Sequence, residues 1–122
     1  MDINAYLELP LGHPPCWELA SKIYAQELGF PCTAYRTING SIRSAAAAFS
    51  LALHKSPDGL TPIAEPVDLC IVLLGKTPKL GFHHCGVYWQ GSVLHALDTG
   101  TVYQDMASIR DQYLLIEFWG RA

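Results

Sequence analysis

The chain has 122 residues, of which 50% are hydrophobic and 16% are charged, and its formal net charge is -3. This length fits one core, so we expect residues 1–122 to form a single domain. The eight Lys and Arg residues form no basic stripe for phosphates, and no apolar stretch approaches the roughly 20 residues of a membrane-spanning helix. Nucleic-acid and membrane partners are therefore not expected.

The start of the chain and its cysteines indicate a reducing compartment. Residues 1–15 lack the basic and continuous apolar regions of a secretory signal, so we expect synthesis in the cytoplasm without export by that route. The four cysteines, Cys16, Cys32, Cys70 and Cys85, form no CxxC pair. This spacing argues against a zinc knuckle and against a dense disulfide framework, and we interpret all four as free thiols.

Helices are predicted in the first half of the chain. Pro14 and Pro15 suit the start of a helix, and Gly29 followed by Pro31 suits its end. A second helical pattern covers residues 41–53. In the first helix, apolar residues recur at steps of three and four and so share one face, with Trp17 beside it: Cys16, Leu19, Ala20, Ile23, Tyr24 and Leu28.

Strands are predicted in the second half. Residues 67–74 are an apolar run typical of a buried strand, and residues 75–81 follow as a loop. Two runs of aromatic and β-branched residues, 83–89 and 92–97, flank Gln90-Gly91 and predict a hairpin. The remaining segments are predicted as a turn, a short strand, a helical turn and a closing strand, at residues 98–100, 102–104, 106–112 and 113–119. Helices followed by a mostly antiparallel sheet indicate an α+β fold with the helical layer on one side of the sheet.

Cys16 stands in the first turn of the predicted helix. The positive end of the helix dipole favours a thiolate at this position and lowers the pKa of the thiol. An isolated cysteine is more often a small buried apolar residue, so the hypothesis of a nucleophile depends on finding a base nearby.

The predicted hairpin supplies two histidines for this role. A two-residue loop pairs Trp89 with Ser92 and makes His84 and His95 diagonal neighbours on one face, with Cβ atoms within roughly 7–8 Å. A four-residue loop would keep this register, whereas a three-residue loop would place the histidines on opposite faces. His84 could then take the proton of Cys16 while His95 fixes its tautomer, although two histidines on one strand face are commonly structural.

Four short motifs occur in a characteristic order: Cys16-Trp17-Glu18-Leu19-Ala20, Val67-Asp68-Leu69, His84-Cys85-Gly86-Val87-Tyr88 and Val93-Leu94-His95-Ala96. This order, with 11 residues from His84 to His95, resembles the NlpC family of papain-related cell-wall cysteine peptidases. The most similar variant is the short form found in bacteriophage tail-tip proteins, where tryptophan follows the cysteine and an aromatic strand, like residues 116–119, closes the chain. The resemblance covers nearly the whole sequence.

The resemblance implies a papain-like fold of the NlpC type, with N-terminal helices packed on a mostly antiparallel sheet. Cys16 would be the nucleophile, His84 its base and His95 the residue that orients the base. Tyr6 is the candidate for a family tyrosine that lines the oxyanion site, and Trp17 is a second candidate for contact with the oxyanion or the substrate.

The implied function is hydrolysis of peptide bonds in peptidoglycan stem peptides, at a D-glutamyl to diamino-acid link, without a cofactor. The phage variant further implies phage tail proteins as partners. It also implies a virion-associated enzyme that is made in the bacterial cytoplasm and delivered to the periplasm.

Three residues depart from the family pattern. Pro15 stands where aspartate is usual and removes a hydrogen-bond donor near the helix start. Glu18 replaces a common glycine, and its negative charge opposes thiolate formation at Cys16. Cys85 replaces an aliphatic residue, and its side chain should point to the face opposite His84.

Two other functions remain open. His83, His84, Cys85 and His95 are zinc-ligand types, but adjacent strand residues point to opposite faces, so at most His84 and His95 would converge. The second alternative is a catalytically inactive relative that serves as a structural or assembly protein of a phage tail. Its motivation is the pair of departures next to Cys16, together with the low surface charge.

Overall fold

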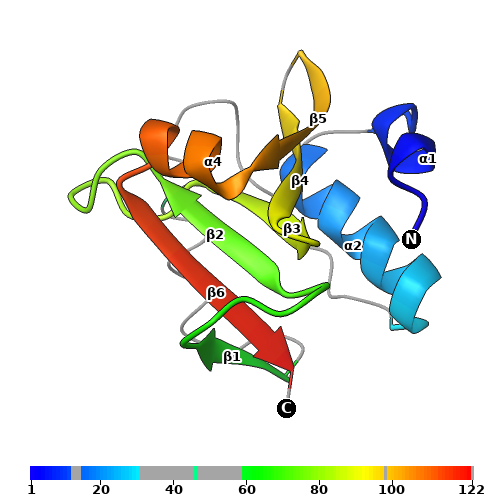
Figure 1. Cartoon of the computed structure of the whole chain (residues 1–122), viewed down its shortest axis with the longest axis horizontal. Coiled ribbons are helices and arrows are strands. Elements are labelled where there is room, and N and C mark those ends of the chain that lie inside the picture. The colour runs from blue at the N-terminus through cyan, green and yellow to red at the C-terminus, as the bar shows by residue number, and fades with distance from the viewer. Residues whose placement is uncertain (12–14, 31–45, 47–58, 98, 122) are drawn as a thin grey trace.

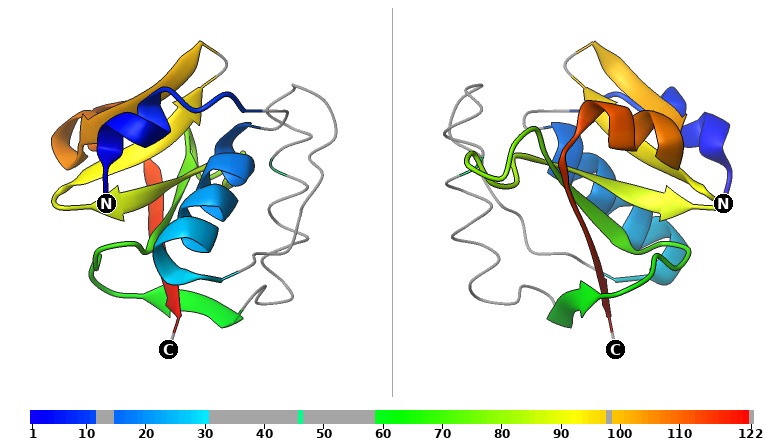
Figure 2. Two further views of the ribbon diagram at one scale, coloured as in Figure 1. Left: turned by 90° about the vertical axis from the view of Figure 1, so that its right-hand side faces the viewer. Right: turned by 60° about the vertical axis from the view of Figure 1, so that its left-hand side comes forward.

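The structure is a computed structural model that describes residues 1–11, 15–30, 46, 59–97 and 99–121. It shows a small α+β protein with a curled antiparallel sheet and helices packed on both faces of that sheet (Figures 1 and 2). The predicted α+β class is therefore confirmed. No helix among the described residues is long and apolar enough to cross a membrane.

The first predicted helix is confirmed as α2 (Pro15–Leu28). Pro15 opens it, as expected of a residue whose missing N–H costs nothing in the first turn. Gly29 ends it in the left-handed region, at φ 63°, and the N–H of Phe30 donates to the carbonyl of Tyr24 at 3.1 Å. Two shorter helices accompany it in the described part of the chain: α1 (Ile3–Leu7) and α4 (Met106–Gln112).

The sheet has six strands in the order β1-β6-β2-β3-β4-β5, and all neighbouring pairs are antiparallel. The closing strand β6 lies between β1 and β2, while β2 to β5 are neighbours in chain order. The strands are β1 (Leu60–Ile63), β2 (Ile71–Gly75), β3 (His84–Trp89), β4 (Ser92–Leu97), β5 (Gly100–Asp105) and β6 (Leu115–Arg121).

The predicted hairpin is formed by β3 and β4 with the predicted register. Trp89 lies opposite Ser92, and the two-residue turn between them has positive φ at both positions, 48° at Gln90 and 87° at Gly91. The carboxylate of Asp68 accepts the backbone N–H of Gln90 at 2.8 Å and holds this turn.

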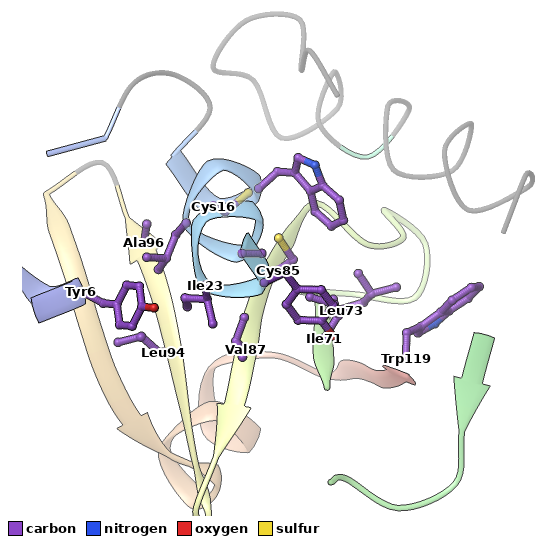
Figure 3. Packing of buried hydrophobic residues seen from close by; sticks show 14 of the residues in the cluster. Tyr6, Cys16, Ile23, Ile71, Leu73, Cys85, Val87, Leu94, Ala96 and Trp119 are labelled. Carbon is purple, nitrogen blue, oxygen red and sulfur yellow. The ribbon is translucent and has the colours of Figure 1, made fainter. Parts of the chain in front are cut away.

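Each face of the sheet buries its own apolar cluster. On β2, Ile71 and Leu73 face α2, whereas Val72 and Leu74 face the opposite side, where Ile109 of α4 packs. Figure 3 shows part of the α2 cluster. The expectation that helices cover one side only is therefore wrong for α4, because β2 is apolar on both faces and needs cover on each.

Several predicted boundaries differ from the structure. The strand expected at residues 67–74 begins later, because Leu69 has φ 70° and the N–H of Cys70 donates to the carbonyl of Val67 in a turn. The closing strand likewise starts late, because Tyr113 caps α4. Neither α1 nor β1 was predicted. The helix predicted at residues 41–53 lies outside the described residues except for Ala46, and so does Cys32.

Candidate active site

Cys16 and His84 come from elements that pack against each other. Cys16 is the second residue of α2, and His84 is the first residue of β3. Both side chains are nearly buried, with 7% of Cys16 and 8% of His84 exposed. The packing of α2 across the start of β3 therefore brings the helix N-terminus, the thiol and the imidazole to one place.

The surroundings of Cys16 favour its thiolate. A side-chain hydrogen bond with Cys85 lowers the pKa of Cys16 well below that of an ordinary thiol, and a hydrogen bond with His84 and its charge lower this pKa further. Burial acts in the opposite direction but is outweighed. These contacts therefore favour the thiolate form of Cys16, which is the form that acts as a nucleophile.

His84 and His95 are in direct contact, as the hairpin register predicted. Nε2 of His84 lies 2.8 Å from Nδ1 of His95, and the rings meet edge to face with centroids 5.0 Å apart. The structure thus brings together the three residues Cys16, His84 and His95 that the sequence singled out.

Gln104 adds a further hydrogen bond to the pair His84 and His95, and this role was not predicted from the sequence. Its Oε1 lies 2.7 Å from Nε2 of His95. An amide oxygen only accepts, so Nε2 of His95 carries a proton and Nδ1 of the neutral ring accepts from Nε2–H of His84. This arrangement leaves Nδ1 of His84 to take the proton of Cys16.

His95 stays neutral in this line. Its side chain is fully buried, and burial together with the charge of His84 lowers the pKa of His95 to about 4. At neutral pH its Nδ1 therefore keeps the lone pair that the N–H of His84 needs. His95 acts as an acceptor that orients His84 and does not compete with it for protons.

Gly86 makes the approach of the two strands possible. A Cβ at this position would lie 2.6 Å from Cγ1 of Val93 and 2.9 Å from Cβ of His95, closer than real Cβ contacts allow. The β3–β4 pairing ends at Val87 and Leu94, so His84 and His95 meet beyond its last pair. Only glycine lets the histidine side chain of β4 lie this close to β3.

Tyr113 is a second residue that sequence patterns did not reveal. Its ring stacks on His84 with centroids 6.0 Å apart and an interplanar angle of 17°. Burial and the negative charge of Cys16 raise the pKa of Tyr113, so its hydroxyl stays protonated. Tyr113 covers the imidazole from the side of α4, whereas the sequence had assigned it only to the start of a strand.

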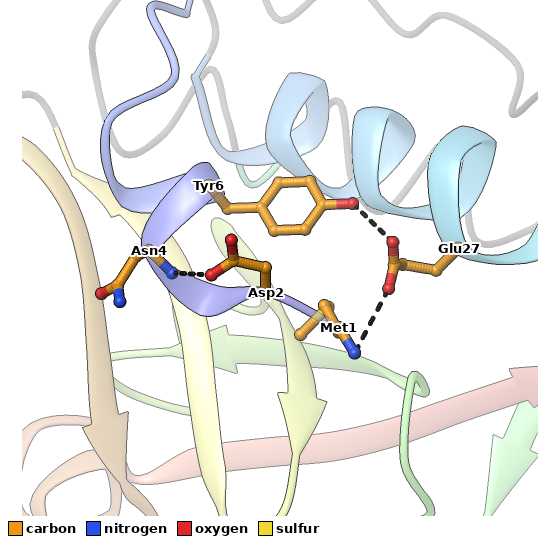
Figure 4. A network of polar contacts seen from close by, with 5 residues as sticks. All are labelled: Met1, Asp2, Asn4, Tyr6 and Glu27. Carbon is orange, nitrogen blue, oxygen red and sulfur yellow. Dashed lines mark hydrogen bonds and ion pairs between the residues drawn. The ribbon is translucent and has the colours of Figure 1, made fainter.

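The structure does not bring Tyr6 to Cys16. The hydroxyl of Tyr6 donates to Glu27 at 3.1 Å (Figure 4), about three helical turns, or roughly 16 Å, along α2 from the thiol. Burial and the Glu27 carboxylate raise the pKa of Tyr6 to about 12. Tyr6 therefore fastens α1 to the far end of α2, and the expectation that it lines an oxyanion site is corrected.

The two residues after Cys16 have different surroundings. Trp17 is buried in the α2 cluster, so its indole is a packing residue in this structure and not an exposed substrate contact. Glu18 is partly exposed, and its carboxylate lies 3.9 Å from the ammonium of Lys22 one turn along the helix. The pKa of Cys16 is lowered even though Glu18 is nearby.

The zinc alternative finds no support in the part of the chain that the structure describes. No three His, Cys, Asp or Glu side chains converge there as a metal site would require. His83 precedes β3, so strand alternation does not govern it, and its ring approaches Tyr113 at 6.2 Å as the ring of His84 does. Its Nε2 accepts the backbone N–H of Lys76 at 3.1 Å, which occupies one of the two ring nitrogens that could bind a metal.

Comparisons with family models, curated proteins and solved structures found no match. The chemistry of the site therefore has to follow from its own geometry. A thiol of lowered pKa at a helix N-terminus, a base with one nitrogen left for the proton of that thiol, and a neutral ring that orients this base together suit nucleophilic attack on a carbonyl carbon.

Proposed function

We propose that this protein is a papain-like cysteine peptidase of the NlpC type. The observation that carries the proposal is the continuous line of contacts from Cys16 through His84 and His95 to Gln104. Each link has a chemical consequence: the thiol gives its proton to His84, the other nitrogen of His84 is bound to His95, and His95 and Gln104 fix the orientation of the base.

In the proposed reaction, the Cys16 thiolate attacks the carbonyl carbon of a peptide bond and forms an acyl-enzyme. The His84 imidazolium gives its proton to the leaving amine, and a water molecule then releases the acyl group with His84 as base. The neutral His95 accepts the Nε2–H of His84 throughout, so the imidazole keeps its orientation while its charge changes.

The substrate is proposed to be the stem peptide of bacterial peptidoglycan, cut at a D-glutamyl to diamino-acid link. The support is the ordered set of motifs shared with the cell-wall peptidases, above all the 11-residue step between the two histidines. The phage tail-tip variant of the same pattern supports delivery by a virion and contact with tail proteins.

Digestion of purified muropeptides, followed by mass analysis of the products, tests this function. We expect cleavage by the wild-type protein, loss of cleavage in Cys16→Ala, and retained cleavage in Cys70→Ala. Cys70 is the matched control because it is also a buried thiol but lies in the turn before β2. Cleavage that survives in Cys16→Ala would refute the assignment of the nucleophile.

An inactive assembly protein of a phage tail is the second candidate. The low exposure of Cys16 and His84 favours it, because a peptide carbonyl reaches the thiolate only if neighbouring groups move. Absence of cleavage in every muropeptide tested, by a protein whose Cys16 still alkylates rapidly, would support this candidate over the peptidase.

A further inference from the structure

Cys85 is a second thiol at the site, and the proposed hydrolysis does not use it. It is the residue after His84, it points to the opposite face of β3 as predicted, and it joins the same buried cluster as Cys16 (Figure 3). The side chains of Cys85 and Cys16 are hydrogen-bonded to each other. A helix residue and a strand residue, 69 positions apart, thus place two sulfur atoms in direct contact.

The two thiols differ in both charge and access. The pKa of Cys16 is lowered and that of Cys85 is raised, so Cys16 is the more acidic thiol of the pair. Cys16 is also 7% exposed, whereas Cys85 is fully buried. A side-chain hydrogen bond to Cys16 raises the pKa of Cys85 well above that of an ordinary thiol, and burial and the negative charge of Cys16 raise it further. An oxidant from solvent would therefore react at Cys16, for two reasons. The thiolate is the reactive form of a cysteine, and Cys16 is the more exposed of the two sulfur atoms.

We propose that Cys16 and Cys85 form a peroxide-reactive dithiol that closes to an intramolecular disulfide. In the first step, the Cys16 thiolate attacks one oxygen of a hydroperoxide and the O–O bond breaks. Cys16 becomes a sulfenic acid, oxidised by two electrons, and the peroxide leaves as an alkoxide or hydroxide that takes a proton from solvent. In the second step, the sulfur of Cys85 attacks the sulfur of the sulfenic acid, the S–O bond breaks, and the hydroxyl group leaves as water with the proton of Cys85.

The first step prepares the second. The hydrogen bond to Cys16 and its negative charge both help to hold the proton on Cys85, and both depend on the Cys16 thiolate. Conversion of that thiolate to a neutral sulfenic acid removes the charge, so the proton of Cys85 is released more easily at the moment when its sulfur is needed. Closure then requires the two sulfur atoms to move from hydrogen-bond contact to the bond length of about 2.05 Å.

The disulfide would protect Cys16 from irreversible oxidation and would also block it. A sulfenic acid that meets no thiol proceeds to sulfinic and sulfonic acids, whereas a disulfide is reversible by thiols. If the proposed peptidase function holds, closure switches hydrolysis off in oxidising surroundings and reduction restores it. This consequence alone depends on the proposed function, because the disulfide can be measured without any substrate.

The test treats folded protein with a small excess of hydrogen peroxide, blocks the remaining thiols under denaturing conditions, and maps the products by peptide mass analysis. In the wild-type protein we expect a Cys16–Cys85 bond, seen as a loss of two hydrogen atoms and reversed by dithiothreitol. In Cys85→Ser, which keeps a hydrogen-bond donor to Cys16 but cannot form a disulfide, we expect sulfinic acid at Cys16. Cys70→Val is the matched control and should close the same bond as the wild type.

The proposal is wrong if wild-type Cys16 accumulates sulfinic acid as fast as it does in Cys85→Ser. It is equally wrong if the disulfide joins another pair, such as Cys16 and Cys32. These outcomes are independent of the muropeptide assay: a protein that hydrolyses muropeptides but forms no Cys16–Cys85 bond refutes only the dithiol, and one that forms the bond without hydrolysis refutes only the peptidase.

Discussion

At the scale of single residues, the site depends on which nitrogen of each histidine carries a proton. Gln104 decides this, because its Oε1 accepts Nε2–H of His95 at 2.7 Å and thereby turns Nδ1 of His95 toward the N–H of His84. The position of Gln104 follows from the sheet, since Val102 lies opposite His95 and Gln104 is two residues further on the same face. We therefore regard Gln104 as a positioning residue.

Replacement of Gln104 tests this role. Gln104→Leu removes the acceptor, so we expect alkylation of Cys16 at neutral pH to slow about tenfold, the equivalent of one partly buried hydrogen bond. Gln104→Glu keeps an acceptor and should retain the wild-type rate. Gln112→Leu, at the exposed end of α4, is the matched control. If Cys16 of a folded Gln104→Leu variant is alkylated as fast as in the wild type, Gln104 does not position His95 and His84.

At the scale of elements, the hairpin and the first helix could be predicted because their signals are local. The three- and four-residue apolar steps after Pro15 predict α2, and the two-residue turn at Gln90-Gly91 fixes the register that joins His84 to His95. The Gln104 and Tyr113 contacts depend on how β5 and α4 return to the hairpin, which no local pattern specifies.

The shortest elements escaped prediction for a physical reason. The strand β1 has four residues, includes Pro62, and buries only Leu60 fully, so it shows no alternation of apolar and polar residues. It is a strand because it pairs with β6, a contact between distant parts of the chain. The helix α1 has five residues, too few to show a helical period, and Tyr6 fastens it through Glu27 of α2.

Substitution of Gly86 tests whether close strand approach builds the site. In Gly86→Ala the new Cβ must displace backbone and His95, so we expect a loss of roughly 1–3 kcal/mol in the free energy of unfolding and slower alkylation of Cys16. Gly120→Ala in β6 is the matched control, because its Cβ would meet only the side chain of Ile63, no closer than 3.2 Å. Urea unfolding and alkylation rates measure both effects. Equal costs for the two variants would argue against a special role for Gly86.

At the scale of the whole molecule, the two faces of the sheet contribute different parts of the site. The face toward α2 buries Cys85 and holds the helix that carries Cys16. The other face, covered by α4, holds the cluster in which Tyr113 stacks against His84. The α+β class was predictable from the order of helical and strand patterns, but the cover on the second face was not, because β2 reads as one apolar run that does not reveal what packs on each side.

The central claim is that this packing makes Cys16 a thiolate paired with His84. The rate of Cys16 alkylation as a function of pH, with Cys70 as the internal reference, measures it most directly. A thiol reacts as the thiolate, so the lowered pKa of Cys16 should keep its rate high as the pH falls below the ordinary thiol range. Burial raises the pKa of Cys70, which should react slowly at neutral pH.

In the wild-type protein we predict an inflection of the Cys16 rate well below that of an ordinary thiol, and in His84→Gln an inflection at higher pH with a slower rate at neutral pH. An inflection of Cys16 in the ordinary thiol range, unchanged by His84→Gln, would contradict the account.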